Sequence, residues 1–192
     1  MRTLRRIGVY CGSNFGAGDA FRAAAAGLGA ELARRQIALV FGGTHKGLMG
    51  VVADAVLAAG GTAHGVITER LAGKGQLHPR LTSHEIAPDM RSRKARMLAL
   101  ADALIALPGG IGTVEEFMEA WTLNQLGDID KPVGLLDVEG YYRAFRAFID
   151  TMVTQGFLPG AHRDGILVRD APAALIDALA AYQPVTVSKW MS

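Results

Sequence analysis

Residues 103–116 read ALIALPGGIGTVEE, and this stretch joins two kinds of element. The apolar run Ala103–Leu107 is typical of a buried strand, and Phe117–Leu126 (FMEAWTLNQL) is typical of a helix. A glycine turn between a strand and a helix leaves backbone N–H groups pointing out of the helix start. Those donors and the positive end of the helix dipole favour an anion, most often phosphate. The stretch therefore predicts an α/β unit with an anion site at Pro108–Glu116.

Apolar, strand-like runs alternate with alanine-rich helical patterns along the rest of the chain. Further strands are expected at Ile7–Cys11, Ile37–Phe41, Thr62–Ile67, Pro132–Leu136 and Ile166–Val168, and further helices at Asp19–Arg35, Gly47–Ala59, Ser92–Ala101, Tyr141–Thr154 and Pro172–Tyr182. Strands this apolar predict an α/β fold with a doubly wound, mostly parallel sheet in a Rossmann-like three-layer sandwich. Ligands of such folds bind at the carboxyl ends of the strands. Thr68–Asp89 lacks a regular pattern and is expected to be a surface loop near that crevice.

The composition bounds the class of protein. A chain of 192 residues predicts one domain over 1–192, with residues 185–192 as a tail. Half of the residues are apolar, which excludes a disordered chain, and a net charge of +2 gives no support to nucleic-acid binding. No apolar run approaches the roughly 20 residues of a membrane span, and the first apolar stretch is too short for a signal peptide. The single Cys11 excludes an internal disulfide and favours a reducing cytoplasm.

Two short segments at predicted strand ends carry ambiguous signals. Gly12-Ser13-Asn14 is either an ordinary turn or a source of hydroxyl and backbone contacts to a phosphate or sugar. In FGGTHKGLMG (residues 41–50), Gly42 and Gly43 permit close backbone approach, although a packing turn would show the same pattern. This segment lacks the G-K-[ST] ending of a nucleoside-triphosphate P-loop.

Basic residues crowd a predicted helix start in DMRSRKARM (residues 89–97). A solvated helix face is the ordinary explanation of a charge run. However, Pro88 and Asp89 signal the start of a helix, and cations at that end oppose the helix dipole. Because such a broken rule often marks a functional site, Arg93 and Lys94 are candidate ligand contacts.

The acids after the glycine turn have two interpretations. Thr113 and Glu116 fit a capping box, T-x-x-E, in which Glu116 only caps its helix. Glu115 would then be a favourable charge in the first turn. In the functional interpretation, both carboxylates act on a phosphorylated ligand. The histidines show no metal-ligand spacing, so no metal is expected.

Taken together, these segments resemble one family. PGGIGTVEE matches the PGGxGTxxE signature of the LOG ("Lonely guy") family, the cytokinin riboside 5′-monophosphate phosphoribohydrolases. VYCGSN (residues 9–14) and FGGTHKGLMG are similar to the family's first turn and its GGGxxGLMG segment. Arg93-Lys94 and Met97 match its RKxxM element, and KPVGLLD followed by GYY (residues 131–142) is also characteristic. The resemblance covers nearly the whole chain. Thr44 stands at the third glycine of GGG, and Arg91 stands where the family usually has His.

The resemblance implies a Rossmann-like homodimer, with its site near the dimer interface, that hydrolyses the N-glycosidic bond of a nucleoside 5′-monophosphate. No cofactor is expected, and the expected location is the cytoplasm. Cytokinin nucleotides and AMP are both possible substrates. Arg93 and Glu116 match the catalytic pair. The matching or candidate binding positions are Ser13, Gly43, Glu69, Lys94, Gly109, Gly110, Ile111, Gly112, Thr113, Val114, Glu115 and Thr122. Relatives also carry the label lysine decarboxylase, but nothing in the sequence resembles a pyridoxal phosphate site.

A non-catalytic carrier is the alternative, because molybdenum-cofactor carriers of related fold also have PGGxGT-type turns. The residues that discriminate are the carboxylates Glu115 and Glu116 together with Arg93 and Lys94, which a carrier does not need in this form. Cleavage of a ribosyl C–N bond builds positive charge on the sugar. Glu116 is the candidate to stabilise that charge and to activate water, with Glu115 on the ribose hydroxyls.

Overall fold

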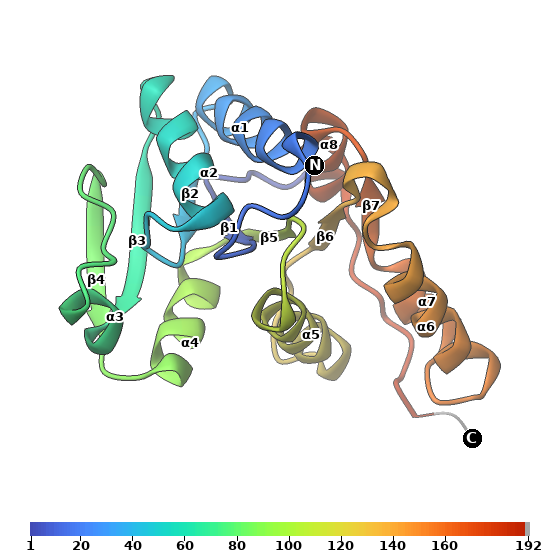
Figure 1. The fold of residues 1–192 in the computed structure, drawn as a ribbon. Helices are drawn as coiled ribbons and strands as arrows, with labels where there is room; N and C mark the ends of the chain where they lie inside the picture. The colour runs from blue at the N-terminus through green and yellow to red at the C-terminus, as the bar shows by residue number, and fades with distance from the viewer. Residues whose placement is uncertain (191–192) are drawn as a thin grey trace.

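The structure is a computed structural model and describes residues 1–190. One sheet of seven strands runs through it in the order β4-β3-β2-β1-β5-β6-β7, and every pairing is parallel (Figure 1). The predicted doubly wound α/β fold is therefore confirmed, with a wholly parallel sheet. The strands are β1 (Arg6–Tyr10), β2 (Ala38–Phe41), β3 (Ala63–Thr68), β4 (Ser83–Ala87), β5 (Ala103–Ala106), β6 (Val133–Leu136) and β7 (Leu167–Arg169).

Helices cover both faces of the sheet. In Figure 1, α1, α2 and α8 lie above it, and α4 and α5 lie below it with α6 and α7 beside them. The helices are α1 (Asp19–Arg34), α2 (Gly47–Ala58), α3 (Glu69–Gly73), α4 (Met90–Leu100), α5 (Ile111–Leu126), α6 (Arg143–Thr154), α7 (Gly160–Asp164) and α8 (Pro172–Ala181), with a 3-10 turn η1 (Val138–Gly140) before α6. None of the helices within residues 1–190 has the length and apolarity to span a membrane.

The core consists of two apolar clusters, one on each face of the sheet. Ile7, Leu39 and Ile105 project toward α1, α2 and α8, and Val40 and Leu104 project toward α4 and α5. Because successive residues of a strand point to opposite faces, strands covered on both sides must be apolar throughout. This is the physical reason that the apolar runs located the central strands.

The chain changes direction across the sheet between β1 and β5. The strands β2, β3 and β4 extend to one side of β1, and β5, β6 and β7 extend to the other side. The loops that leave β1 and β5 therefore diverge, and a crevice opens at the carboxyl edge of the sheet. The backbone N–H of Gly12 donates to the carbonyl of Pro108 at 3.1 Å, which ties the two loops together below that crevice.

The segment Thr68–Asp89 is not the irregular loop that was expected. It contains the short helix α3 and the edge strand β4, whose five residues SHEIA are mostly exposed or half-buried. An edge strand has one neighbour and one poorly covered face, so it needs no apolar run and its pattern stays weak. At the other end of the chain, residues 182–190 hold no helix or strand; Met191 and Ser192 of the predicted tail lie outside the described residues.

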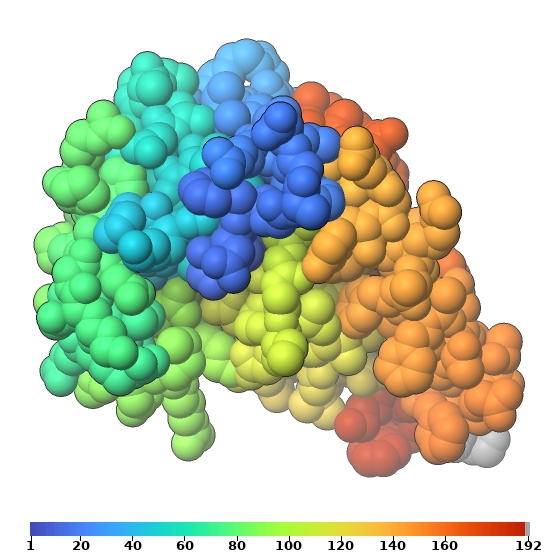
Figure 2. Space-filling view, in the orientation of Figure 1, coloured from blue at the N-terminus to red at the C-terminus, as the bar shows by residue number. Residues whose placement is uncertain are grey.

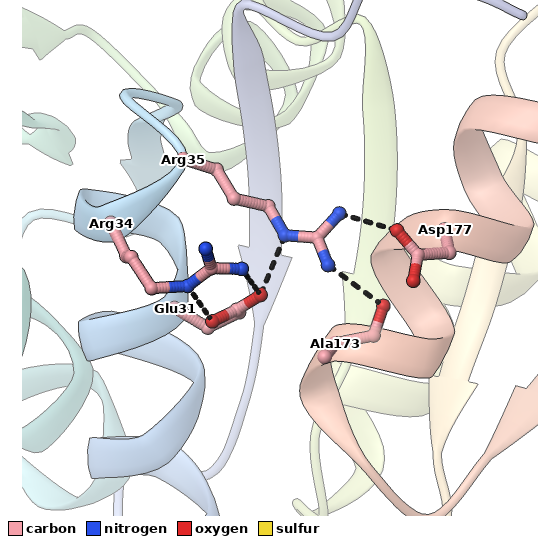
Figure 3. Close-up of polar contacts among 5 residues, drawn as sticks. All are labelled: Glu31, Arg34, Arg35, Ala173 and Asp177. Carbon is pink, nitrogen blue, oxygen red and sulfur yellow. Dashed lines mark hydrogen bonds and ion pairs between the residues drawn. The ribbon is translucent and has the colours of Figure 1, made fainter.

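Charged side chains join the end of α1 to α8. Glu31 accepts hydrogen bonds from Arg34 at 2.7 Å and from Arg35 at 2.6 Å, and Arg35 also reaches Asp177 at 2.5 Å (Figure 3). Arg35 donates further to the carbonyl of Ala173. These hydrogen bonds hold the pKa of Glu31 at about 2, well below its usual range. The network joins α1 to α8, which cover the same face of the sheet.

Two glycines of α1 provide a matched test of how closely α1 and α2 pack. A Cβ at Gly29 would lie 2.6 Å from the carbonyl oxygen of Val52, whereas a Cβ at Gly27 would meet nothing nearer than 4.0 Å. Gly27→Ala should stabilise the protein by roughly 0.5–1 kcal/mol through helix propensity. Gly29→Ala should destabilise it by about 1 kcal/mol or more through overpacking. Urea unfolding measures both, and equal stabilisation by the two substitutions would contradict the close packing.

Candidate active site

A cavity of about 660 Å³ opens at the carboxyl edge of the sheet, beyond the ends of β1, β2, β3 and β5. Figure 2 views this edge, where the blue, cyan and yellow-green segments of the chain meet around a hollow. The cavity therefore lies at the switch in strand order, where the fold predicts a ligand. Its lining residues are Cys11, Ser13, Asn14, Thr44, Lys46, Met49, Arg70, Leu71, Gln76, Met90, Arg93, Lys94, Gly110, Ile111, Gly112, Thr113, Glu115 and Glu116.

Most of the predicted site residues meet at this cavity, although they are far apart in sequence. Ser13 comes from the loop after β1, and the start of α4 and the start of α5 provide the others. The predicted residues that line it are Ser13, Arg93, Lys94, Gly110, Ile111, Gly112, Thr113, Glu115 and Glu116.

The helix after the glycine turn starts earlier than the capping box implied. Helix α5 begins at Ile111 with Gly110 as its N-cap, and no side chain caps it. Of the two interpretations of Thr113 and Glu116, the capping box is therefore excluded, because Thr113 lies at the third helical position. The first N–H groups of a helix have no partner within it. At α5 the Thr113 N–H donates to the Gly110 carbonyl at 3.1 Å, so the place for an anion is at the N–H groups of Ile111 and Gly112, whose residues line the cavity.

Two tyrosines hold the turn that leads into α5. The Tyr142 hydroxyl donates to the carbonyl of Leu107, and the Tyr141 hydroxyl donates to the carbonyl of Gly109, both at 2.6 Å. Tyr142 is buried, and its ring packs edge-on against the ring of Tyr141. The carbonyl groups on either side of Pro108 are thus fixed, and the start of α5 keeps one position relative to β5.

Arg93 is buried at the inner wall of the cavity. Helix α4 begins after Asp89, whose carboxylate accepts a hydrogen bond from the Ser92 N–H at 2.7 Å, so the predicted helix-start signal is confirmed. One turn later, Arg93 Nε donates to the carbonyl of Val66 at 2.9 Å, and its Nη1 lies 3.4 Å from Glu116 Oε1. The other guanidinium nitrogen occupies the space that a Cβ at Gly42 would need. Gly42 therefore makes room for the guanidinium.

Glu116 faces Arg93 from α5 and is largely buried, with 13% of its side chain exposed. Burial raises the pKa of this carboxyl to about 7, the neighbouring Arg93 opposes the rise, and the charge of Glu115 adds to it. A carboxyl group with a pKa near 7 exists in both protonation states at neutral pH. This is the property expected of a general base or acid.

Lys94 also connects α4 to α5, closer to the surface than the ion pair between Arg93 and Glu116. Its Nζ forms ion pairs with Glu115 and, at 3.1 Å, with Glu119. Burial disfavours the charged amine, but the hydrogen bonds to these two carboxylates outweigh it and raise the pKa of Lys94. Arg93 and Lys94 are therefore balanced by acids of α5, and Arg96 is balanced by Glu85 of β4, which explains how this helix tolerates them.

Five predicted binding residues lie outside the cavity lining. Glu69 and Thr122 are exposed on α3 and α5, and Val114 is half-buried on α5. Gly43 lies behind Thr44, with φ of +74° and its carbonyl bonded to the His78 N–H. Gly109 adjoins Gly12 under the turn. From these positions Gly43 and Gly109 support the cavity wall. Ligand contacts of all five residues stay predictions.

Several lining residues were not identified from the sequence. Met49, Leu71 and Met90 add apolar surface, and Lys46, Arg70 and Gln76 add polar groups. Lys46 lies inside FGGTHKGLMG (residues 41–50), and this glycine-rich segment was already expected to lie near the ligand. Arg70 and Gln76 lie in the segment taken for an irregular loop. Cys11 is buried at the end of β1, as expected, and burial raises the pKa of its thiol well above the usual range.

The fold has close counterparts among solved structures. The molybdenum cofactor binding protein from Rippkaea orientalis aligns with a TM-score of 0.70 at 21% sequence identity, over 94% of this chain and 98% of its own. The molybdenum cofactor carrier protein from Chlamydomonas reinhardtii aligns with the same TM-score and identity, over 94% and 100% of the two chains. At this level of identity the similarity shows the fold alone.

Similarity in sequence is much higher to a set of plant enzymes. The family described as "Possible lysine decarboxylase" matches residues 49–179. A probable cytokinin riboside 5′-monophosphate phosphoribohydrolase of Oryza sativa subsp. japonica is 45% identical over 183 residues, which cover 95% of this chain and 80% of the rice protein. A cytokinin riboside 5′-monophosphate phosphoribohydrolase of Arabidopsis thaliana is 43% identical over 181 residues, 94% of this chain and 85% of the plant protein. The chain therefore belongs to the LOG family, the cytokinin riboside 5′-monophosphate phosphoribohydrolases.

Proposed function

We propose that the protein hydrolyses the N-glycosidic bond of nucleoside 5′-monophosphates and releases a free base and ribose 5-phosphate. The observation that carries the proposal is the position of Glu116. Its buried carboxyl group lines the cavity together with the uncapped start of α5 at Gly110–Thr113. A phosphate held at that helix start places the attached sugar beside a carboxyl group whose pKa is about 7.

The residues support a direct hydrolysis. The ionised carboxylate of Glu116 takes a proton from water, and the water oxygen attacks C1′ of the ribose. The C1′–N bond breaks, its electron pair stays on the base, and the proton that Glu116 accepted passes to the base nitrogen, which restores the carboxylate. The same carboxylate stabilises the positive charge that develops on the sugar before attack is complete. A buried, ionised carboxylate is suited to both tasks because little water screens it.

Arg93 and Glu115 have supporting roles in this scheme. Arg93 is held by the Val66 carbonyl and pairs with Glu116 at 3.4 Å, so it orients the carboxylate and assists departure of the base. Glu115 lies next along α5, also lines the cavity, and is placed to bind the ribose hydroxyls. Its partner Lys94 limits the repulsion between the two neighbouring carboxylates.

The substrate is proposed to be a purine nucleotide, either AMP or a cytokinin riboside 5′-monophosphate. The relatives are named for the cytokinin compounds. The two departures from the family pattern lie at or near the cavity. Thr44 is buried in its lining, and Arg91 is exposed beside Met90 in the first turn of α4. Incubation of the protein with AMP and with isopentenyladenosine monophosphate ranks the two substrates.

The carrier alternative predicts binding without base release. The likeness to molybdenum-cofactor proteins is a likeness of fold, and it does not extend to an argument about ligand. Arg93, Glu115 and Glu116 favour the hydrolase, because a carrier has no need of a buried carboxyl group beside a sugar. Retained nucleotide binding with no base released from any nucleoside monophosphate favours the carrier.

We also propose that the protein is a cytoplasmic homodimer whose interface lies near the site. Large apolar side chains are exposed around the cavity and along α5, at Met90, Ile111 and Leu126. Thr122, which the family resemblance assigns to nucleotide binding, is exposed on α5 outside its own cavity. A second copy placed against α5 would cover these residues and bring Thr122 toward a cavity.

Glu116→Gln should reduce base release by at least about 10³-fold, because the amide cannot accept the proton of water. The protein should still fold and bind nucleotide, because the amide is nearly isosteric and can accept a hydrogen bond from Arg93, with some loss of stability from the unpaired Arg93 charge. Chromatographic measurement of free base, with nucleotide binding measured by calorimetry, tests both points. An active Glu116→Gln variant would show that another group activates the water.

The pH dependence of kcat/KM should show an acidic limb near pH 7. The carboxylate is the active form, so activity should rise as the pH rises through the pKa of Glu116 and fall below it. Glu115→Gln should move this limb to lower pH, because the charge of Glu115 raises that pKa. An unchanged limb in this variant would assign the titration to a different group.

Unfolding provides a control that does not depend on turnover. The folded-state pKa of Glu116, about 7, lies above the ordinary pKa of 4.5 for a glutamate carboxyl, so folding favours the protonated group. Its contribution to stability should be fully present below about pH 4.5 and lost as the pH rises through about 7. Glu116→Gln should therefore be relatively more stable at pH 8 than at pH 5, compared with the unsubstituted protein.

A further inference from the structure

A methionine sulfur contacts the buried ion pair of the cavity. Arg93 Nη1 donates to Met90 Sδ at 3.2 Å, and the same nitrogen lies 3.4 Å from Glu116 Oε1. Met90 is the first residue of α4 and lies one turn before Arg93, so the helix itself places the sulfur beside the guanidinium. Within residues 1–190, no other methionine sulfur accepts a hydrogen bond from a charged side chain. The nitrogen that orients the carboxylate of Glu116 is therefore shared with an oxidisable atom.

Met90 is open to small molecules. The residue is 42% exposed, and it lines the cavity, so a peroxide molecule reaches its sulfur by the route that the substrate takes. Met49 also lines the cavity but is half-buried. Cys11 is buried at the cavity wall, where burial raises the pKa of its thiol, and a protonated thiol is a poor nucleophile. Met90 thus has the most exposed sulfur of the cavity lining.

We propose that Met90 is an oxidation site, and that its sulfoxide draws Arg93 away from Glu116 and lowers the activity. The effect on activity rests on the proposed function. In the reaction with hydrogen peroxide, a lone pair of the sulfur forms a bond to one oxygen and the O–O bond breaks. The second oxygen leaves with that electron pair and becomes water by proton transfer. The sulfur loses two electrons and the peroxide gains them, so no further reactant is needed.

The added oxygen competes with Glu116 for the guanidinium. A thioether sulfur is a weak acceptor, whereas a sulfoxide is polar and its oxygen accepts a hydrogen bond more strongly. Because 3.2 Å between Nη1 and the sulfur leaves no room for an oxygen, the guanidinium of Arg93 must shift to donate to it. Glu116 then keeps less of the opposite charge that favours its ionised form. The other groups that act on this carboxyl or sense its charge are Lys94, Glu115, Glu119, Tyr10 and Cys11.

Peroxide treatment followed by peptide mapping locates the added oxygen. Trypsin releases residues 81–91, in which Met90 is the single methionine, and residues 47–70, in which Met49 is the single methionine. The first peptide should gain the mass of one oxygen before the second. Base release at pH 7 should fall with the oxidised fraction of residues 81–91, by about tenfold or more, the effect of a lost hydrogen bond to a charged group.

The pH profile of the treated protein distinguishes a shifted guanidinium from general damage. Arg93 holds the pKa of Glu116 down, so the acidic limb should move to higher pH once the sulfoxide draws Arg93 away. A loss of folded protein alone would lower the activity at every pH and leave the limb in place. Treatment should also lower the Tm by about 2 °C or more, because a buried ion pair is weakened, and this measurement needs no turnover.

Two leucine variants form a matched pair, and each is compared with its own untreated form. Met90→Leu has no sulfur at this position, so peroxide should change neither its activity nor its Tm. Met49→Leu removes the other methionine of the cavity lining and should stay as sensitive as the unsubstituted protein. Dithiothreitol should not restore the treated protein, because it reduces the reversible oxidation products of a thiol such as Cys11 but not a sulfoxide.

The outcomes separate this inference from the proposed hydrolase. Oxidation of Met49 ahead of Met90, an equal loss in treated Met90→Leu, an acidic limb that stays in place, or recovery with dithiothreitol would each overturn the role of Met90. Base release by the untreated protein is measured first. Its absence would contradict the hydrolase, whereas a Tm loss confined to proteins that contain Met90 would still establish that the sulfoxide weakens the ion pair.

Discussion

The ion pair between Arg93 and Glu116 determines how the two helices at the cavity are held together. An unpaired charge of either sign would be costly at these buried positions. Arg93 is satisfied by Glu116 and by the Val66 carbonyl at the end of the sheet, so α4 is anchored to β3 as well as to α5. Lys94 repeats the connection toward the surface through Glu115 and Glu119. The cavity keeps its shape because neither helix can shift without exposing or separating these charges.

The topology explains how these residues reach one another. Helix α4 follows the edge strand β4 but runs back beneath β3, β2 and β1, and this return brings Arg93 under the middle of the sheet. Helix α5 begins at the neighbouring strand β5, on the other side of the switch in strand order. Glu116 and Arg93 are thus separated by 23 residues in sequence and by 3.4 Å in space. The parallel sheet also brings together the loops that follow β1 and β2, because the carboxyl ends of these neighbouring strands lie side by side.

Much of the fold could be read from the sequence because its central strands are covered on both faces. Ala103–Leu107 and Ile7–Cys11 had to be apolar throughout, so their type and order were clear. The edge strand β4 was missed for the opposite reason, because an exposed strand does not require that pattern. Arg93, Lys94, Glu115 and Glu116 were found because cations at a helix start and acids beside a glycine turn break or strain local rules. Arg70 and Gln76 break none, and their place in the cavity follows from tertiary contacts that no local pattern encodes.

The capping box shows the limit of such reading. T-x-x-E at Thr113–Glu116 satisfied a local rule, but the helix had already begun at Ile111, and Glu116 turns to Arg93 instead of its own helix start. A local signal and a distant partner competed for the same side chain, and the buried charge of Arg93 was the stronger constraint.

The residues of the cavity wall come from two different parts of the chain. The acids and their cations come from α4 and α5, which are locked to each other, whereas Lys46, Arg70 and Gln76 come from the segments that follow β2 and β3. The residues proposed to react and to hold the phosphate and ribose therefore come from α4 and α5, while other residues of the lining come from separate stretches of chain. Substitutions in residues 44–46 and 70–76 would change the cavity wall without altering the proposed acids and their cations. A lineage built on this scaffold can diversify its substrates without rebuilding its catalyst.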